Sequence, residues 1–163
     1  MHKLSNYRKI IPMLDHVDRK LVGLLQQDGR LTNAELAERV GLSQSACHRR
    51  VKRLEDTGVI SGYGAFVDRR RVGLNVLGYV SVKMESHSEE LLNKFMRGVE
   101  AMDEIVACYA IAGDADYLLQ VVSTDMDSYG QMAVKKLARL PGVKDSTTKF
   151  VLSTVKLDPA WPI

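Results

Sequence analysis

The sequence predicts an α+β protein in which a winged helix-turn-helix domain precedes a βαββαβ ferredoxin-like domain. Three observations carry this prediction. Three amphipathic helical patterns with turn signals between them occupy the first part of the chain. Strand and helix patterns then follow in the order strand, helix, strand, strand, helix, strand. The charge also changes sign along the chain. Residues 1–71 hold 14 Lys and Arg against 8 Asp and Glu, whereas residues 72–163 hold 9 Lys and Arg against 12 Asp and Glu.

The first two helices are predicted from apolar spacing and capping residues. Residues 14–28 are typical of an amphipathic helix that ends at Gly29. Its apolar face is formed by Leu14, Val17, Leu21, Leu24 and Leu25. Thr32 or Asn33 is then the N-cap of a second helix, with Glu35 near the position that completes a capping box.

The segment from Asn33 to Glu55 predicts two helices joined by a tight turn. Gly41 suits the turn because a residue without Cβ accepts left-handed dihedrals, and Ser43 is a natural N-cap. The second helix buries Cys47, Val51 and Leu54 on one face and carries basic residues on the other. A short basic helix held by a partner helix is the geometry that enters a DNA major groove, so the segment indicates a DNA-binding protein.

The early residues of this recognition helix are expected to read base edges: Gln44, Ser45, His48 and Arg49. Arg49 suits a bidentate contact to guanine, whereas Lys52 and Arg53 are expected on phosphates, which set affinity and register. Arg50 lies nearer the core edge, where a structural role is expected. A solvated helical face is the alternative interpretation, and the gathering of cations away from the core disfavours it.

The chain is expected to divide into five parts. Glycines at 58, 62 and 64 and an alternating pattern over residues 59–67 predict a β-wing and exit strand. The parts are a lead-in (1–14), the DNA-binding domain (15–67), a charged linker (68–73), the second domain (74–157) and a C-terminal tail (158–163). The lead-in carries no prediction of secondary structure.

The second domain is expected to contain four strands and two helices. The strands are predicted over residues 76–84, 104–112, 117–123 and 143–155. One helix begins at Ser88, and the other is capped by Thr124 or Asp125 and broken by Pro141-Gly142. This order predicts a sheet with both helices on one face, and we expect a partner subunit to meet the uncovered face.

Both halves together resemble the Lrp/AsnC ("feast/famine") family of transcriptional regulators, over residues 14–155. The motifs that carry the resemblance are Val40-Gly41-Leu42-Ser43, Arg50-Val51-Lys52-Arg53-Leu54-Glu55, Gly113-Asp114-Ala115-Asp116 and Leu140-Pro141-Gly142-Val143. The resemblance implies a RAM-type C-terminal domain that forms homodimers, which assemble further into tetramers to octamers, and that binds an amino acid or related metabolite. It also implies that effector binding changes the assembly or the placement of the DNA-binding domains, and so changes transcription.

The turn from Gly113 to Asp116 is the predicted effector site. A zwitterionic amino acid needs an anion for its ammonium group and N–H donors for its carboxylate; Asp114 or Asp116 can supply the first and the backbone near Gly113 the second. Ser146 and Thr148 alternate onto one face of the last strand and complete the predicted shell. The resemblance places the family's effector-contacting turn and strand here. A plain hairpin turn is the alternative interpretation of Gly-Asp-x-Asp.

Composition excludes several function classes. No apolar run is long enough to span a bilayer and the N-terminus lacks a secretory signal, so a cytoplasmic location is the default expectation. Cys47 and Cys108 are expected to be small buried hydrophobes, and no metal ion, cofactor or catalytic residue is predicted. Two alternatives remain: an architectural protein that wraps double-stranded DNA without an effector, and an enzyme or an enzyme's regulatory module. The second is disfavoured because the sequence shows no nucleophile with a base, metal cluster or phosphate loop.

Overall fold

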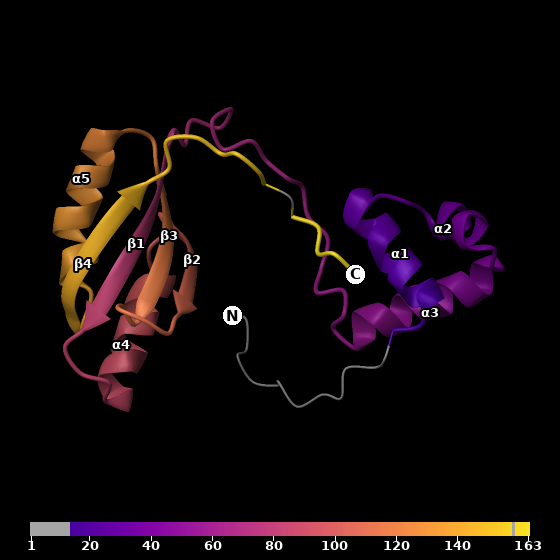
Figure 1. Cartoon of the computed structure of the whole chain (residues 1–163), viewed down its shortest axis with the longest axis horizontal. Coiled ribbons are helices and arrows are strands. Elements are labelled where there is room, and N and C mark those ends of the chain that lie inside the picture. Colours follow the sequence, from indigo (N-terminus) through magenta and orange to yellow (C-terminus); the bar gives the residue numbers. More distant parts are fainter. Residues whose placement is uncertain (1–13, 158) are drawn as a thin grey trace. The chain divides into compact units, whose positions relative to one another are not determined.

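The computed structural model describes residues 14–157 and 159–163, which divide into two compact units (Figure 1). Of the described residues, 14–66, 156, 157 and 159–163 belong to the first unit, and Val67–Val155 form the second. Apart from Leu14, the predicted lead-in lies outside the described residues. Among the described residues, no helix combines the length and apolar character that crossing a membrane requires.

The described part of the first unit contains three helices: α1 (His16–Gln27), α2 (Asn33–Val40) and α3 (Gln44–Asp56). Their ends follow from local hydrogen bonds. Thr32 and Glu35 form a capping box at the start of α2. Gly41 ends α2 in the left-handed conformation at φ 70°, and the Ser43 hydroxyl accepts from the Ala46 backbone N–H in the first turn of α3. The predicted helix-turn-helix is therefore confirmed.

The core of this unit lies where the three helices meet. Its buried apolar side chains are Leu21, Leu36, Ala37, Cys47, Val51 and Leu54. Each helix thus buries the face that its apolar spacing predicts. Full burial of a leucine side chain contributes about 1.5–3 kcal/mol, so Leu21, Leu36 and Leu54 supply much of the packing energy that holds α3 in place.

The strand predicted over residues 59–67 is not formed. Residues 61–67 have no regular secondary structure, because a strand needs a partner for its backbone groups and no described segment pairs with them. The side chain of Tyr63 fastens this segment to the helices instead. Its hydroxyl donates to Glu55 Oε1 at 2.9 Å, and a Cβ at Gly29 would lie 3.3 Å from its ring.

The second unit is a four-stranded antiparallel sheet with two α-helices. The strands are β1 (Val76–Met84), β2 (Ile105–Ala110), β3 (Tyr117–Ser123) and β4 (Val143–Phe150), and the helices are α4 (Glu89–Glu100) and α5 (Met126–Lys135). The strand order is β2-β3-β1-β4, which is the predicted ferredoxin-like arrangement. A short 3₁₀ helix, Leu137–Arg139, follows α5. The last strand ends at Phe150 instead of the predicted Val155.

One face of the sheet forms the core with α4 and α5 (Figure 1). Val80 and Leu119 are fully buried in the middle of this face, against Phe95 of α4 and Tyr129 of α5. The opposite face is open in the single chain. Cys108, which was expected to be buried, is exposed because it lies on the edge strand β2, whose side chains are mostly exposed. That prediction is wrong, whereas the prediction for Cys47 is confirmed.

Candidate DNA-reading surface and effector pocket

The exposed face of α3 carries side chains that are available to a partner. Four of the predicted DNA-contacting residues are exposed and make no side-chain hydrogen bond or ion pair within the described part of the chain: Gln44, His48, Arg49 and Lys52. The Ser45 hydroxyl lies 3.3 Å from that of the N-cap Ser43. The cations Arg49 and Lys52 are therefore free to meet phosphates or base edges.

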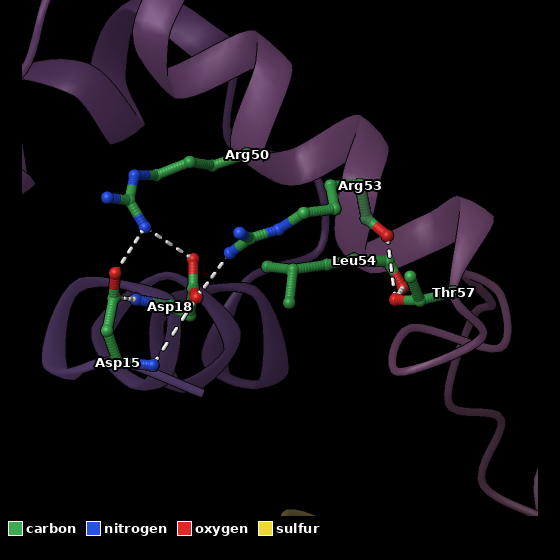
Figure 2. Close-up of polar contacts among 6 residues, drawn as sticks. All are labelled: Asp15, Asp18, Arg50, Arg53, Leu54 and Thr57. Carbon is green, nitrogen blue, oxygen red and sulfur yellow. Dashed lines mark hydrogen bonds and ion pairs between the residues drawn. The ribbon is translucent and has the colours of Figure 1, made fainter. Parts of the chain in front are cut away.

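Arg50 and Arg53 differ from these residues because both pair with acids at the start of α1, the N-cap Asp15 and Asp18 (Figure 2). Arg50 Nη1 lies 2.6 Å from Asp15 Oδ2 and 2.9 Å from Asp18 Oδ1. Arg53 Nη2 lies 2.5 Å from Asp18 Oδ2. Hydrogen bonding from the Asp18 backbone N–H, with the Arg50 side chain, lowers the pKa of Asp15 to about 2. The sequence did not predict that Asp18, which is buried, pairs with these two arginines of α3.

The β2–β3 turn borders a pocket of about 360 Å³ on the open face of the sheet. Asp114 and Ala115 contribute from the turn, whereas the remaining lining comes mainly from β1 and β4. Those residues are Ser81, Lys83, Ile111, Asp145, Thr147 and Lys149. The lining therefore combines two lysines, two aspartates and two hydroxyls with a small apolar surface.

Asp116 does not line this pocket but fastens the turn to the end of β1. Its Oδ2 accepts from the Met84 backbone N–H at 2.7 Å, and its Oδ1 lies 2.7 Å from His87 Nε2. Its own backbone N–H donates to the Val82 carbonyl at 2.9 Å. The hydrogen bond from Met84, and then the one with His87, lower the pKa of the Asp116 carboxyl. Gly113 lies in the same turn with φ 133°, a conformation that favours glycine.

Ser146 and Thr148 lie on the helix-covered face of β4. They pair in register with Val82 and Val80, which are fully buried on that face. The Thr148 hydroxyl forms a hydrogen bond with the Tyr129 hydroxyl of α5. The structure thus brings Asp114 together with Asp145, Thr147 and Lys149, which sequence analysis missed, and keeps the two predicted hydroxyls out of the pocket.

Comparison with known proteins identifies the family of this chain. The profile of the Lrp/AsnC ligand binding domain matches residues 77–161, and that of a winged helix-turn-helix DNA-binding domain matches residues 14–61. Over 151 residues the chain is 38% identical to the DNA-binding transcriptional activator DecR of Escherichia coli K12, covering 93% of this chain and 99% of DecR. The chain belongs to the Lrp/AsnC family. It is therefore a DNA-binding regulator with a ligand-binding domain, as the sequence predicted.

Other relatives of this Lrp/AsnC regulator support the same family assignment. The leucine-responsive regulatory protein of Escherichia coli K12 is 38% identical over 143 residues, covering 88% of this chain and 87% of that protein. Among solved structures, a transcriptional regulator of Neisseria meningitidis in complex with L-Met has a TM-score of 0.87 and 37% identity, covering 92% of this chain and 97% of that one. An AsnC family regulator of Agrobacterium tumefaciens has a TM-score of 0.85 and 36% identity, covering 91% and 97%. These relatives are transcriptional regulators, and none of these names describes an enzyme.

Proposed function

We propose that this Lrp/AsnC regulator binds a free amino acid in the pocket beside the β2–β3 turn. The observation that carries the proposal is the pairing of opposite charges in one small pocket. Lys83 and Lys149 suit the carboxylate of a zwitterion, whereas Asp114 and Asp145 suit its ammonium group. A volume of about 360 Å³ lies within the range of small-molecule pockets, roughly 300–1,000 Å³.

The remaining lining suits the rest of such a ligand. Ser81 and Thr147 offer hydroxyls that both donate and accept hydrogen bonds, and Ile111 and Ala115 offer apolar surface to a side chain. A structural relative from Neisseria meningitidis forms a complex with L-Met, an apolar amino acid, which supports the same ligand class here. In this proposal Asp116 holds the turn in shape and does not contact the ligand.

The proposed DNA contacts lie on α3. Gln44, Ser45, His48 and Arg49 meet base edges in the major groove, and Lys52 and Arg53 meet phosphates. Exposure supports this part of the proposal, because the first four and Lys52 all lie on the exposed side of the helix.

The proposed assembly is a homodimer, which associates further into tetramers to octamers. The open face of the sheet supports it, because that face lacks a covering layer in the single chain. Exposed apolar side chains on β2 support it as well: Val106 is 53% exposed and Tyr109 is 54% exposed.

A thermal-shift screen of the full chain against the twenty amino acids tests the effector proposal. A ligand at about one hundred times its dissociation constant adds roughly 2.7 kcal/mol, which raises the melting midpoint by several degrees. We expect one or a few amino acids to do so for the wild type and for Lys144→Gln, a control on the same strand outside the pocket lining. We expect Lys149→Gln to lose the response.

The other outcomes are equally informative. A full response in Lys149→Gln would exclude this pocket as the effector site. If no amino acid stabilises the wild type, the architectural alternative gains support, in which the protein wraps DNA without an effector.

A further inference from the structure

A buried carboxylate contacts the recognition helix from α1. Asp18 is 1% exposed, yet both of its oxygens face α3: Oδ1 lies 2.9 Å from Arg50 Nη1 and Oδ2 lies 2.5 Å from Arg53 Nη2 (Figure 2). A negative charge beside a helix that meets a polyanion weakens binding by simple electrostatics. Asp18 Oδ2 also accepts from the Asp15 backbone N–H at 3.4 Å in the capping box that begins α1, so the acid has a local structural role, and its pairing with Arg53 is what bears on DNA binding.

We propose that Asp18 is a positioning residue for DNA binding. Its carboxylate fixes the guanidinium of Arg53 at the side of α3, so that the remaining N–H groups of Arg53 form a preorganised phosphate contact. The inference rests on the DNA-binding role of α3.

The geometry of Arg53 fits this role. A guanidinium carries five N–H donors in a planar fork, and the ion pair with Asp18 engages Nη2. Within the described residues its Nε and Nη1 make no hydrogen bond or ion pair, and the side chain is 49% exposed. Arg53 lies four residues after Arg49, so the two are neighbours on the helix surface at the edge of the reading face.

Arg50 and Asp15 belong to the same cluster of ion pairs. Arg50 Nη1 bridges Asp15 and Asp18, and its side chain is 30% exposed. The cluster thus holds two guanidiniums and two carboxylates, so it adds little net charge to the surface. What Asp18 provides is the fixed orientation of Arg53, because an immobilised guanidinium loses less conformational entropy when it meets a phosphate.

Full-length Asp18→Asn and Glu38→Gln test the proposal, with fluorescence anisotropy on a mixed-sequence DNA duplex as the readout. Glu38 is exposed on α2 and its side chain has no partner among the described residues, so both variants lose one negative charge from the same domain. Charge alone predicts tighter binding for both. We expect Asp18→Asn to weaken binding by about tenfold, the size of one charge-assisted hydrogen bond, and Glu38→Gln not to weaken it.

Arg53→Gln shows whether Asp18 acts through Arg53. We expect this variant to reduce the slope of log affinity against log salt by about 0.9, as the loss of one phosphate contact does. We also expect Asp18→Asn to have no further effect in its background. The inference is overturned if Asp18→Asn binds as tightly as Glu38→Gln, or if it weakens Arg53→Gln as much as it weakens the wild type.

Circular dichroism checks that each variant is folded at the assay temperature. If Asp18→Asn does not fold, Arg53→Lys serves instead, because it keeps both the carboxylate and the positive charge but cannot contact two anions through a planar fork. Binding by Arg53→Lys equal to that of the wild type would refute the inference. Failure of the wild type to bind DNA at all would contradict the proposed DNA contacts instead, so the two failures are distinguishable.

Discussion

Thr148→Val removes one hydroxyl from the interface between β4 and α5 and leaves the shape of the side chain almost unchanged. Thr148 and Tyr129 share a hydrogen bond, and Tyr129 is only 8% exposed, so the tyrosine hydroxyl would lose its partner in a place with little access to water. A buried polar group without a partner costs about 1–3 kcal/mol. In a domain of this size each kcal/mol lowers the melting midpoint by about 4–8 °C.

Scanning calorimetry of the full chain measures this change, and Thr147→Val is the matched control. Thr147 is exposed on the open face and its hydroxyl has no partner among the described residues. The control should therefore change stability by less than about 0.5 kcal/mol, while it weakens the response to the effector. Equal losses of stability in the two variants, or a larger loss in Thr147→Val, would refute our assignment of the faces of β4.

Three further predictions concern α3, the residue before β4 and the β2–β3 turn. Arg49→Ala should weaken binding to a selected operator by about 1–3 kcal/mol and relax the base preference at one base pair, whereas Lys52→Ala should weaken binding to all DNA sequences alike. Identical sequence preferences in the two variants would contradict this. Gly142→Ala should lower the free energy of unfolding, measured by urea denaturation, by about 1–3 kcal/mol, because φ is 77° and the new Cβ would lie 2.6 Å from the Leu91 side chain. An unchanged urea midpoint would contradict this prediction. The pKa of Asp116 is lowered in the folded protein, so its stabilisation is fully present above the ordinary aspartate pKa of 3.8 and is lost as the pH falls through the folded pKa. The difference in stability between wild type and Asp116→Asn should therefore shrink at low pH, and a difference that grows there would contradict this reasoning.

Features fixed by local chemistry could be predicted from the sequence. Ser43 is an N-cap as expected, and Thr32 is the N-cap of the two candidates Thr32 and Asn33, because a hydroxyl in the right place satisfies helix N–H groups without help from distant residues. The strand over residues 76–84 matches β1 residue for residue, since its alternating apolar pattern reports burial against the helices directly. Both signals act over a few residues.

The pocket could not be predicted fully because a β-bulge reverses the alternation of β4. Lys83 pairs with Asp145 but Met84 pairs with Val143, so Lys144 is an extra residue in the strand. After it, Ser146 and Thr148 share the helix-covered face with Val143, and the odd-numbered residues Asp145, Thr147 and Lys149 face the open side. A strict period of two starting from Val143 would place Asp145 on the covered face, so only the pairing register with β1 assigns the faces.

The missing wing has a different cause. Glycines and alternating residues after α3 predict a strand, but residues 61–67 have no regular secondary structure. Whether extended chain becomes a strand depends on a partner elsewhere in the structure, and no local pattern provides one. Asp18, by contrast, left a signal that could have been used. It lies four residues after Leu14 and three before Leu21, on the apolar face of α1, where a carboxylate needs a cationic partner.

The cations of α3 show why counting charges was not enough to locate the DNA-reading surface. Four basic residues lie within Arg49–Arg53, and composition treats them alike. The two acids at the start of α1 separate them into groups. Arg50 pairs with both Asp15 and Asp18, and Arg53 pairs with Asp18 through Nη2. Arg49 and Lys52 have no partner in the described chain. The net charge of the domain favours its approach to DNA, but the contacts of individual side chains decide which cations are unpaired, which keeps free N–H groups beside its ion pair, and which ties α3 to the start of α1.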